Sequence, residues 1–180
     1  MEFLTTDIAG LLIIKPDIFR DDRGYFFESY NQDKFDESGL DVTFVQDNES
    51  KSAKGIIRGL HFQSPPFEQG KLVRVVKGSI LDVAVDIRRK SPTYGKWSSV
   101  KLSGENKWMY WIPPGFAHGF VSLEDDTVVF YKCTNVYNKD AERSIIWNDP
   151  VLHIDWGVKE PMVSEKDNKA PGFKELNTPF

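Results

Sequence analysis

The chain has 180 residues, of which 40% are hydrophobic and 13% aromatic, and its formal net charge is −4. This length and composition favour one globular domain over residues 1–180, and the negative net charge offers no general attraction to nucleic acid. The sequence contains no apolar run long enough to span a membrane, and its acidic start lacks the pattern of a signal peptide, so we expect a cytoplasmic protein.

The amino-terminal third is expected to hold one short strand, a charged loop and one helix. The apolar run Leu11–Ile14 ends just before Lys15 and a proline, which predicts the strand. The loop Phe19–Tyr30 could be a turn capped by acids, although it mixes arginines with aromatic residues in a way that a simple turn does not require. Asn31–Ser38 predicts a short helix, because its first residue is a good N-cap and Gly39 follows as a stop signal.

After Val42–Gln46, short apolar runs separated by turn residues indicate an all-β fold. The turn signals are Gly78, Ser91-Pro92, Gly104, Pro113-Pro114-Gly115 and Glu124-Asp125-Asp126. Ile80–Arg88 alternates with a period of two, as a strand with two different faces does. Val128–Thr134 is apolar on both faces, which favours a strand inside a sandwich or barrel, with Cys133 as a small buried hydrophobe. The tail Pro161–Phe180 is expected to be irregular, with a solvated loop over its Ser-Glu-Lys-Asp segment.

Two further runs, Arg58–Gln63 and Lys71–Val75, are predicted to be strands of one hairpin. The prolines and the glycine between them are typical of a hairpin loop, which would place His61 and Lys71 on neighbouring strands. Because side chains alternate along a strand, His61 shares a face with Gln63. Leu60 and Phe62 lie on the opposite face, are apolar and suit a core.

A lone histidine is more commonly structural, with a hydrogen bond to a backbone carbonyl, but the setting of His61 favours chemistry. His118 lies in a second, loop-like segment rich in glycine, and a β-barrel with two such histidines resembles the cupin or jelly-roll class. Many cupins hold a metal, but Gln63 stands where a second histidine ligand is typical and His153 is far along the chain. We therefore expect a metal-free site with His61 as a base. The alternative is a non-catalytic barrel that binds a sugar or a nucleotide.

Seven motifs follow one another along the chain. They are Arg23–Glu28, Val45–Asn48, Arg58–Gln63, Gly70–Val75, Pro114–Phe120, Tyr131–Thr134 and Ser164–Asp167. Together they resemble the motifs of the dTDP-4-dehydrorhamnose 3,5-epimerase family. The resemblance implies an all-β, cupin-like jelly roll (double-stranded β-helix) with a few short peripheral helices. It also implies a homodimer without metal or other cofactor, acting on a dTDP-linked 4-keto-6-deoxy sugar in the pathway to dTDP-L-rhamnose.

The same resemblance implies four catalytic residues. His61 resembles the family's base, and Asp167 resembles the carboxylate that hydrogen-bonds it. Tyr131 resembles the proton donor on the opposite face of the sugar, and Lys71 resembles the cation near the C4 oxygen. These residue types suit the chemistry, because a neutral imidazole can accept a proton at neutral pH and a nearby cation stabilises a developing oxyanion.

The resemblance also implies substrate-binding positions and a shared site. The positions are Arg23, Phe26, Glu28, Gln46, Asn48, Arg58, His118, Glu142 and Lys166. Of these, Arg23 and Arg58 would hold the diphosphate and Phe26 would pack on the thymine. The amino-terminal segment would reach into the partner's site in the dimer. Relatives that invert only C3 or only C5 share the same base and acid, so a single-centre epimerase stays open as an alternative.

Overall fold

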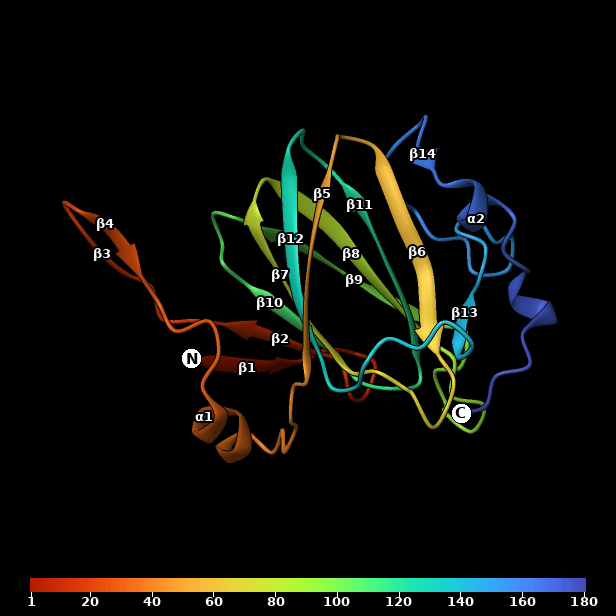
Figure 1. Cartoon of the computed structure of the whole chain (residues 1–180), viewed down its shortest axis with the longest axis horizontal. Coiled ribbons are helices and arrows are strands. Elements are labelled where there is room, and N and C mark those ends of the chain that lie inside the picture. Colours follow the sequence, from red (N-terminus) through yellow and green to blue (C-terminus); the bar gives the residue numbers. More distant parts are fainter.

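Two β-sheets packed face to face form the body of the protein (Figure 1), and the computed structural model describes residues 1–180. The first sheet runs in the order β1 (Glu2–Thr5), β2 (Leu12–Lys15), β10 (Met109–Ile112), β7 (Lys71–Lys77), β12 (Thr127–Cys133) and β5 (Gln46–Ser52). The second runs β13 (Glu142–Ser144), β6 (Ile56–Gln63), β11 (Phe116–Ser122), β8 (Ser79–Asp86) and β9 (Trp97–Ser103), and β14 (Met162–Val163) pairs in parallel with β6. The predicted all-β jelly roll is confirmed.

The remaining elements lie outside the two sheets. Strands β3 (Phe19–Asp21) and β4 (Gly24–Phe26) form a separate hairpin, here called the arm, which projects away from the body (Figure 1). The helices are α1 (Gln32–Glu37), α2 (Glu165–Asn168) and the 3₁₀ turn η1 (Phe173–Glu175). None of them combines the length and hydropathy that a bilayer crossing needs.

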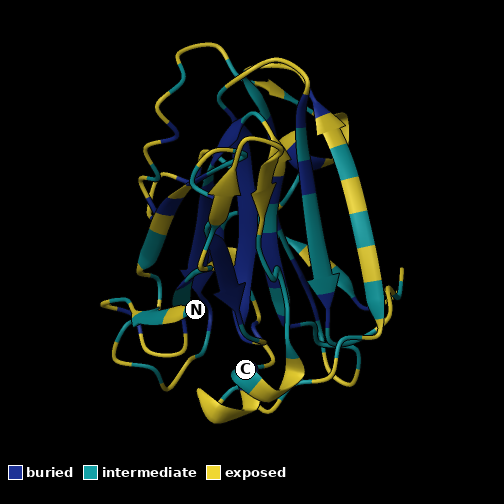
Figure 2. Cartoon of the chain, turned by 90° about the vertical axis from the view of Figure 1, so that its left-hand side faces the viewer, coloured by how far each residue is buried: buried dark blue, intermediate teal, exposed yellow.

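The second sheet is buried on both faces, and the strand β8 shows why. Ile80 and Ala84 point into the core between the sheets, whereas Val83 and Val85 point outward into a second core. The carboxyl-terminal segment covers this outer face, and Trp156 packs there. The predicted period of two in β8 is confirmed. Figure 2 shows the resulting buried strands at the centre of the body, with exposed residues in the surrounding loops.

The predicted helix is confirmed as α1, and its capping follows the sequence signals. The Asn31 side chain accepts a hydrogen bond from the backbone N–H of Lys34, and Gly39 follows the helix with φ +85°. Phe35 is the buried residue of the helix, and it packs with Ile14 and Trp111 against the outer face of the first sheet. The helix therefore seals one edge of the body and lies apart from the second sheet.

The expected hairpin of β6 and β7 is wrong, because the two strands belong to different sheets. The chain between them crosses from one sheet to the other, so His61 and Lys71 face each other across the interior. Proline and glycine mark where a strand ends, but they do not specify which strand becomes its partner.

Four other local expectations also need correction. The loop Phe19–Tyr30 contains the paired strands of the arm, and His118 lies within strand β11 rather than in a loop. The tail is not irregular throughout, because it contains β14, α2 and η1. Asp167 in α2 is only 3% exposed, so the expected solvated loop is instead a capped turn packed on the body.

Asp86, at the end of β8, illustrates how a buried carboxylate is compensated in this fold. It is fully buried and accepts hydrogen bonds from Arg88, Ser91 and Thr93. Burial alone raises the pKa of Asp86, but these hydrogen bonds outweigh it and lower the pKa to about 2. The ionised form therefore stabilises the turn between β8 and β9.

We expect Asp86→Asn to lower the free energy of unfolding by about 2 kcal/mol at pH 7. Because the folded-state pKa is depressed, this stabilisation is complete above the unfolded pKa of about 3.9 and is lost as the pH falls toward 2. Urea denaturation at pH 7 and pH 3 measures the difference. Asp7→Asn, at an exposed site without an ion pair, is the control. An equal loss at both pH values would contradict the prediction.

Candidate active site

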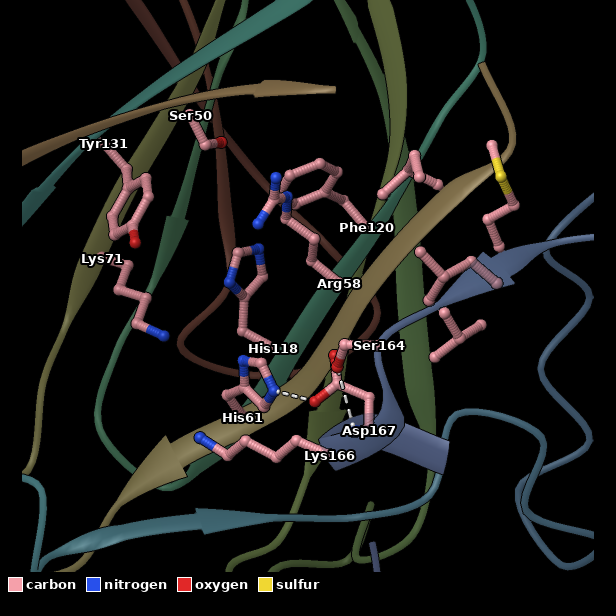
Figure 3. A pocket seen from close by; sticks show the side chains of 14 residues that line it. Ser50, Arg58, His61, Lys71, His118, Phe120, Tyr131, Ser164, Lys166 and Asp167 are labelled. Atoms are coloured by element: carbon pink, nitrogen blue, oxygen red, sulfur yellow. Dashed lines mark hydrogen bonds and ion pairs between the residues drawn. The ribbon is translucent and has the colours of Figure 1, made fainter. Parts of the chain in front are cut away.

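A cavity of about 520 Å³ opens between the two sheets, next to β14 and α2. Figure 3 shows side chains from both sheets and from α2 converging on it. A second cavity of about 330 Å³ adjoins the first and shares His61, Lys71 and Tyr131 with it. The two cavities therefore form one continuous site, with these three side chains at the junction.

His61 and Asp167 form a hydrogen-bonded pair on one wall of the cavity. The Nε2 atom of His61 lies 2.6 Å from Oδ1 of Asp167, and Oδ2 accepts the backbone N–H of Gly59 at 3.4 Å. The Ser164 hydroxyl caps α2 by accepting the backbone N–H of Asp167, which fixes the helical turn that carries the carboxylate. The imidazole Nδ1 has no hydrogen-bond partner in the chain and can accept a proton from a bound molecule.

The electrostatics of this pair favour an ionised carboxylate beside the imidazole. Burial raises the pKa of Asp167, but the hydrogen bond and charge of His61, together with the Gly59 and Ser164 contacts, outweigh burial and lower that pKa below its usual value. A charged carboxylate on one ring nitrogen fixes the histidine tautomer and stabilises the imidazolium that forms when the other nitrogen takes a proton.

A local irregularity in β6 turns both Arg58 and His61 toward the cavity. Two residues three positions apart on a regular strand point to opposite faces. Here the register with β11 shifts between the pairs His118–His61 and Phe120–Arg58, so the strand bulges at Gly59. Gly59 has φ +128°, and a Cβ there would lie 2.5 Å from the Cα of Gly119. The alternation expected from the sequence does not include this bulge.

Lys71 and Tyr131 face the histidine from the first sheet, on the neighbouring strands β7 and β12 (Figure 3). Burial lowers the pKa of Lys71, although the nearby groups Cys133, Asp82 and Glu142 act in the opposite direction. The amine of Lys71 forms no ion pair, because no carboxylate lies within 4 Å of it. Burial also raises the pKa of Tyr131, so the phenol keeps its proton at neutral pH. A phenol and an imidazole therefore lie on opposite walls of one cavity.

Two more of the expected residues are held rigidly beside the cavity. Arg58 donates from Nε to the Ser52 hydroxyl at 3.1 Å and from one terminal nitrogen to the Lys51 carbonyl at 3.2 Å. His118 places Nε2 at 2.8 Å from Oδ1 of Asp82, which is fully buried. Cations and polar rings positioned in this way can bind an anionic ligand.

Of the remaining expected positions within the body, three line the second cavity and one, Lys166, lines the first. Gln46, Asn48 and Glu142 line the second cavity. Lys166, on α2, forms an ion pair with Glu142 at 2.5 Å, which joins the helix to β13 beside His61. The structure thus brings these polar groups next to the histidine, although they come from widely separated parts of the chain.

Three expected positions lie away from the cavity of their own chain. Arg23 and Phe26 are in the arm, where the Arg23 side chain is 90% exposed and Phe26 is 66% exposed. Glu28 follows the arm and binds Asn31 and Lys34 instead of any cavity residue. A single chain does not bring these three residues to the site.

Sequence reasoning missed three residues at or beside the cavities, namely Ser50, Asp82 and Tyr137. Tyr137 lines the second cavity, where its hydroxyl donates to Glu142 at 3.0 Å. Ser50 lies on the strand β5, whose polar alternation gives no hydrophobic signal. The one local signal in β5 is that uncharged polar residues alternate with charged ones, and this alternation does not show which face is buried.

No three side chains of the His, Cys, Asp and Glu types come together in a way that could hold a metal ion. Gln63, at the position where a second histidine is typical of metal cupins, uses its amide to tie loops together. It donates to the carbonyls of Phe67 and Val136 and accepts the backbone N–H of Asn138.

Comparisons with known proteins agree with this architecture over nearly the whole chain. The family model of dTDP-4-dehydrorhamnose 3,5-epimerase matches residues 5–175. A dTDP-4-dehydrorhamnose 3,5-epimerase of Shigella flexneri is 54% identical over 178 residues, which cover 98% of each chain.

Solved structures give the same result. The crystal structure of dTDP-4-dehydrorhamnose 3,5-epimerase from Elizabethkingia anophelis superposes with a TM-score of 0.94 at 49% identity and covers 98% of each chain. The Legionella pneumophila enzyme RmlC, in complex with dTDP-4-keto-L-rhamnose, has a TM-score of 0.94 at 48% identity, covering 98% of this chain and 94% of that one.

The partly desolvated amine of Lys71 leads to a prediction about stability. Because the pKa of Lys71 is lower in the folded protein, folding disfavours the charged amine, and this destabilises the protein at neutral pH. The destabilisation disappears once the pH exceeds the pKa of the amine in the unfolded chain, about 10.4. We expect Lys71→Met to raise the free energy of unfolding by about 1 kcal/mol at pH 7, with a smaller gain above pH 10.

Urea denaturation at pH 7 and pH 10.5 measures this gain. Lys101→Met, at an exposed site on β9 without an ion pair, is the control and should change the free energy of unfolding by less than about 0.5 kcal/mol. A clear loss of stability in Lys71→Met at pH 7 would show that the amine is compensated in the folded protein.

Proposed function

This chain belongs to the dTDP-4-dehydrorhamnose 3,5-epimerase family, and from that membership we infer that it is an isomerase of dTDP-L-rhamnose biosynthesis. It converts dTDP-4-dehydro-6-deoxy-D-glucose to dTDP-4-dehydro-L-rhamnose by inverting C3 and C5. The observation that supports the chemistry best is the His61–Asp167 pair on one wall of a cavity, with Tyr131 on the other.

Inversion begins with removal of a proton from the carbon next to the C4 ketone. That proton is acidic only because the resulting charge moves onto the ketone oxygen as an enolate. His61 accepts the proton through Nδ1, while Asp167 on Nε2 stabilises the imidazolium. Asp167 acts through the histidine and does not touch the reacting carbon.

The opposite wall completes the inversion. Lys71 stabilises the developing charge on the C4 oxygen, and loss of such a stabiliser typically costs on the order of 100-fold to 1000-fold in rate. Tyr131, whose burial keeps the phenol protonated, returns a proton to the other face of the carbon. Because C3 and C5 both flank C4, one base, one acid and one oxyanion stabiliser can serve both centres if the ring repositions.

The substrate is held by its charged and polar parts. Arg58 binds the diphosphate, for which a forked guanidinium is suited, and His118 assists from the adjacent strand. The polar residues Gln46, Asn48, Glu142 and Lys166 surround the nucleotide and the sugar from the second cavity and its rim. No step requires a metal or another cofactor.

We propose that the enzyme is a two-fold dimer in which the arm completes the partner's site. Arg23 would then bind the partner's diphosphate, Phe26 would pack on its thymine and Glu28 would add a polar contact. The projecting arm and the exposure of Arg23 and Phe26 support this proposal, since neither residue reaches the cavity of its own chain (Figure 1). The cytoplasmic location stays a prediction.

The first prediction from the proposed function concerns exchange with solvent. In deuterium oxide the wild-type enzyme should introduce deuterium at both C3 and C5, because both protons pass through an enolate. His61→Asn should abolish both exchanges, whereas Tyr131→Phe should impair inversion more than exchange, since it removes the acid and leaves the base. Mass spectrometry and NMR of the product sugar, after reduction by a 4-ketoreductase with NADPH, measure label and configuration.

The outcomes separate the alternatives. Inversion without label at either carbon would contradict the enolate mechanism, and label at only one carbon would identify a single-centre epimerase. A protein that binds the substrate without exchange would be a non-catalytic barrel. The same assay after treatment with a chelator should give unchanged rates. A loss of activity that is restored by adding one metal would refute the metal-free mechanism.

The second prediction tests the exchanged arm. Arg23→Ala and His61→Asn should each be nearly inactive alone, but mixing them should restore activity, because a heterodimer contains one site with neither substitution. At full random exchange about half of the molecules are heterodimers, so about a quarter of all sites should be intact. Differently tagged chains confirm the exchange. Heterodimers with no activity would show that each arm serves its own chain.

A further inference from the structure

The strand β5 lines the cavity with a row of polar side chains, and one of them has no partner. Gln46, Asn48, Ser50 and Ser52 alternate along the inner face of β5. Gln46 bonds Asn48 and the backbone of Tyr137, Asn48 also contacts Cys133, and Ser52 accepts from Arg58. The Ser50 hydroxyl is buried and makes no hydrogen bond within the chain. Such an unsatisfied group in a folded protein calls for a partner.

The hydroxyl of Ser50 lies between the residues that hold the phosphate and those that perform the chemistry. The two residues that follow it, Lys51 and Ser52, both accept hydrogen bonds from Arg58, so the guanidinium lies beside Ser50. On the other side Ser50 pairs with Val129 of β12, two residues before Tyr131. Figure 3 shows Ser50 at the cavity wall between Tyr131 and Arg58, with its hydroxyl directed toward the side on which Arg58 lies.

We propose that Ser50 hydrogen-bonds the C2 hydroxyl of the sugar and thereby selects for it; this rests on the proposed function. The diphosphate on C1 is bound by Arg58, and carbons C3 to C5 lie among the catalytic residues. The sugar hydroxyl between these two regions is the one on C2. A serine hydroxyl both donates and accepts, so it can pair with another hydroxyl in either direction.

This contact has a defined effect on selectivity. C2 does not change its bonds during the reaction, so the contact strengthens the binding of substrate and transition state equally and acts on KM more than on kcat. A sugar without the C2 hydroxyl leaves the buried serine unpaired, and a site built around such a hydrogen bond rejects that sugar.

The test compares two sugars that lack the C4 ketone, so it does not depend on turnover. We expect wild-type protein to bind dTDP-glucose about 10-fold more tightly than dTDP-2-deoxyglucose in isothermal titration calorimetry. Ser50→Ala should bind the two sugars equally, because it lacks the hydroxyl that distinguishes them. Ser99→Ala, at an exposed position on β9, should keep the wild-type preference. Thermal unfolding of each variant shows that it is folded.

Each result decides the proposal. Equal binding of both sugars by the wild type, or an undiminished preference in Ser50→Ala, overturns it. A parallel loss of affinity for both sugars in Ser50→Ala also overturns it, since that pattern indicates a structural role beside Arg58. Failure of the proposed function is seen separately, as the absence of deuterium exchange by the wild type with the 4-keto sugar.

Discussion

The hydrogen bond between His61 and Asp167 joins groups 106 residues apart, and the organisation of the site depends on it. His61 lies on the eight-residue strand β6 of the second sheet, but Asp167 is in a helix of only four residues. A single helical turn is not stable by itself, because the free energy lost in nucleating the helix exceeds the free energy gained from one turn of hydrogen bonds. The turn exists because its surroundings hold it: β14 pairs with β6 ahead of it, and the backbone of Ile146 bonds Pro171 behind it.

A second sheet that is buried on both faces makes this arrangement possible. Its outer core, with Trp156 and Phe173, fixes the carboxyl-terminal segment that carries Asp167. Its inner face shares the apolar core between the sheets, and polar side chains replace apolar ones along the two cavities, from the end of β6 near β14 to the end beside β13. The proposed catalytic groups therefore lie on strands, and Asp167 on the helix α2, around a partly desolvated cavity, where charge interactions are stronger than in water.

The site divides its tasks between the two sheets. The proposed base, His61, and the proposed diphosphate ligand, Arg58, both come from β6, and the bulge at Gly59 turns both toward the same space. The proposed acid, Tyr131, comes from β12 and the proposed oxyanion stabiliser, Lys71, comes from β7, across the cavity. This opposition suits inversion, which needs a proton to leave one face of a carbon and return to the other. The arm, which lies apart from this cavity, leaves room for a contribution from a second chain.

The sequence by itself determined the local features and the identity of the chemical groups. The alternation in β8 and the caps of α1 were predicted correctly because period and capping depend only on neighbouring residues. The seven motifs identified the family, although they did not show how its residues meet.

Tertiary structure decided what depends on distant partners. It separated β6 from β7, placed a strand where β5 shows only polar alternation, and ordered the tail around Asp167. It also turned Arg58 inward against the regular period. The physical reason is the same in each case: which strand pairs with which, and which polar face becomes buried, follows from contacts between residues far apart in the chain, and no local pattern contains them.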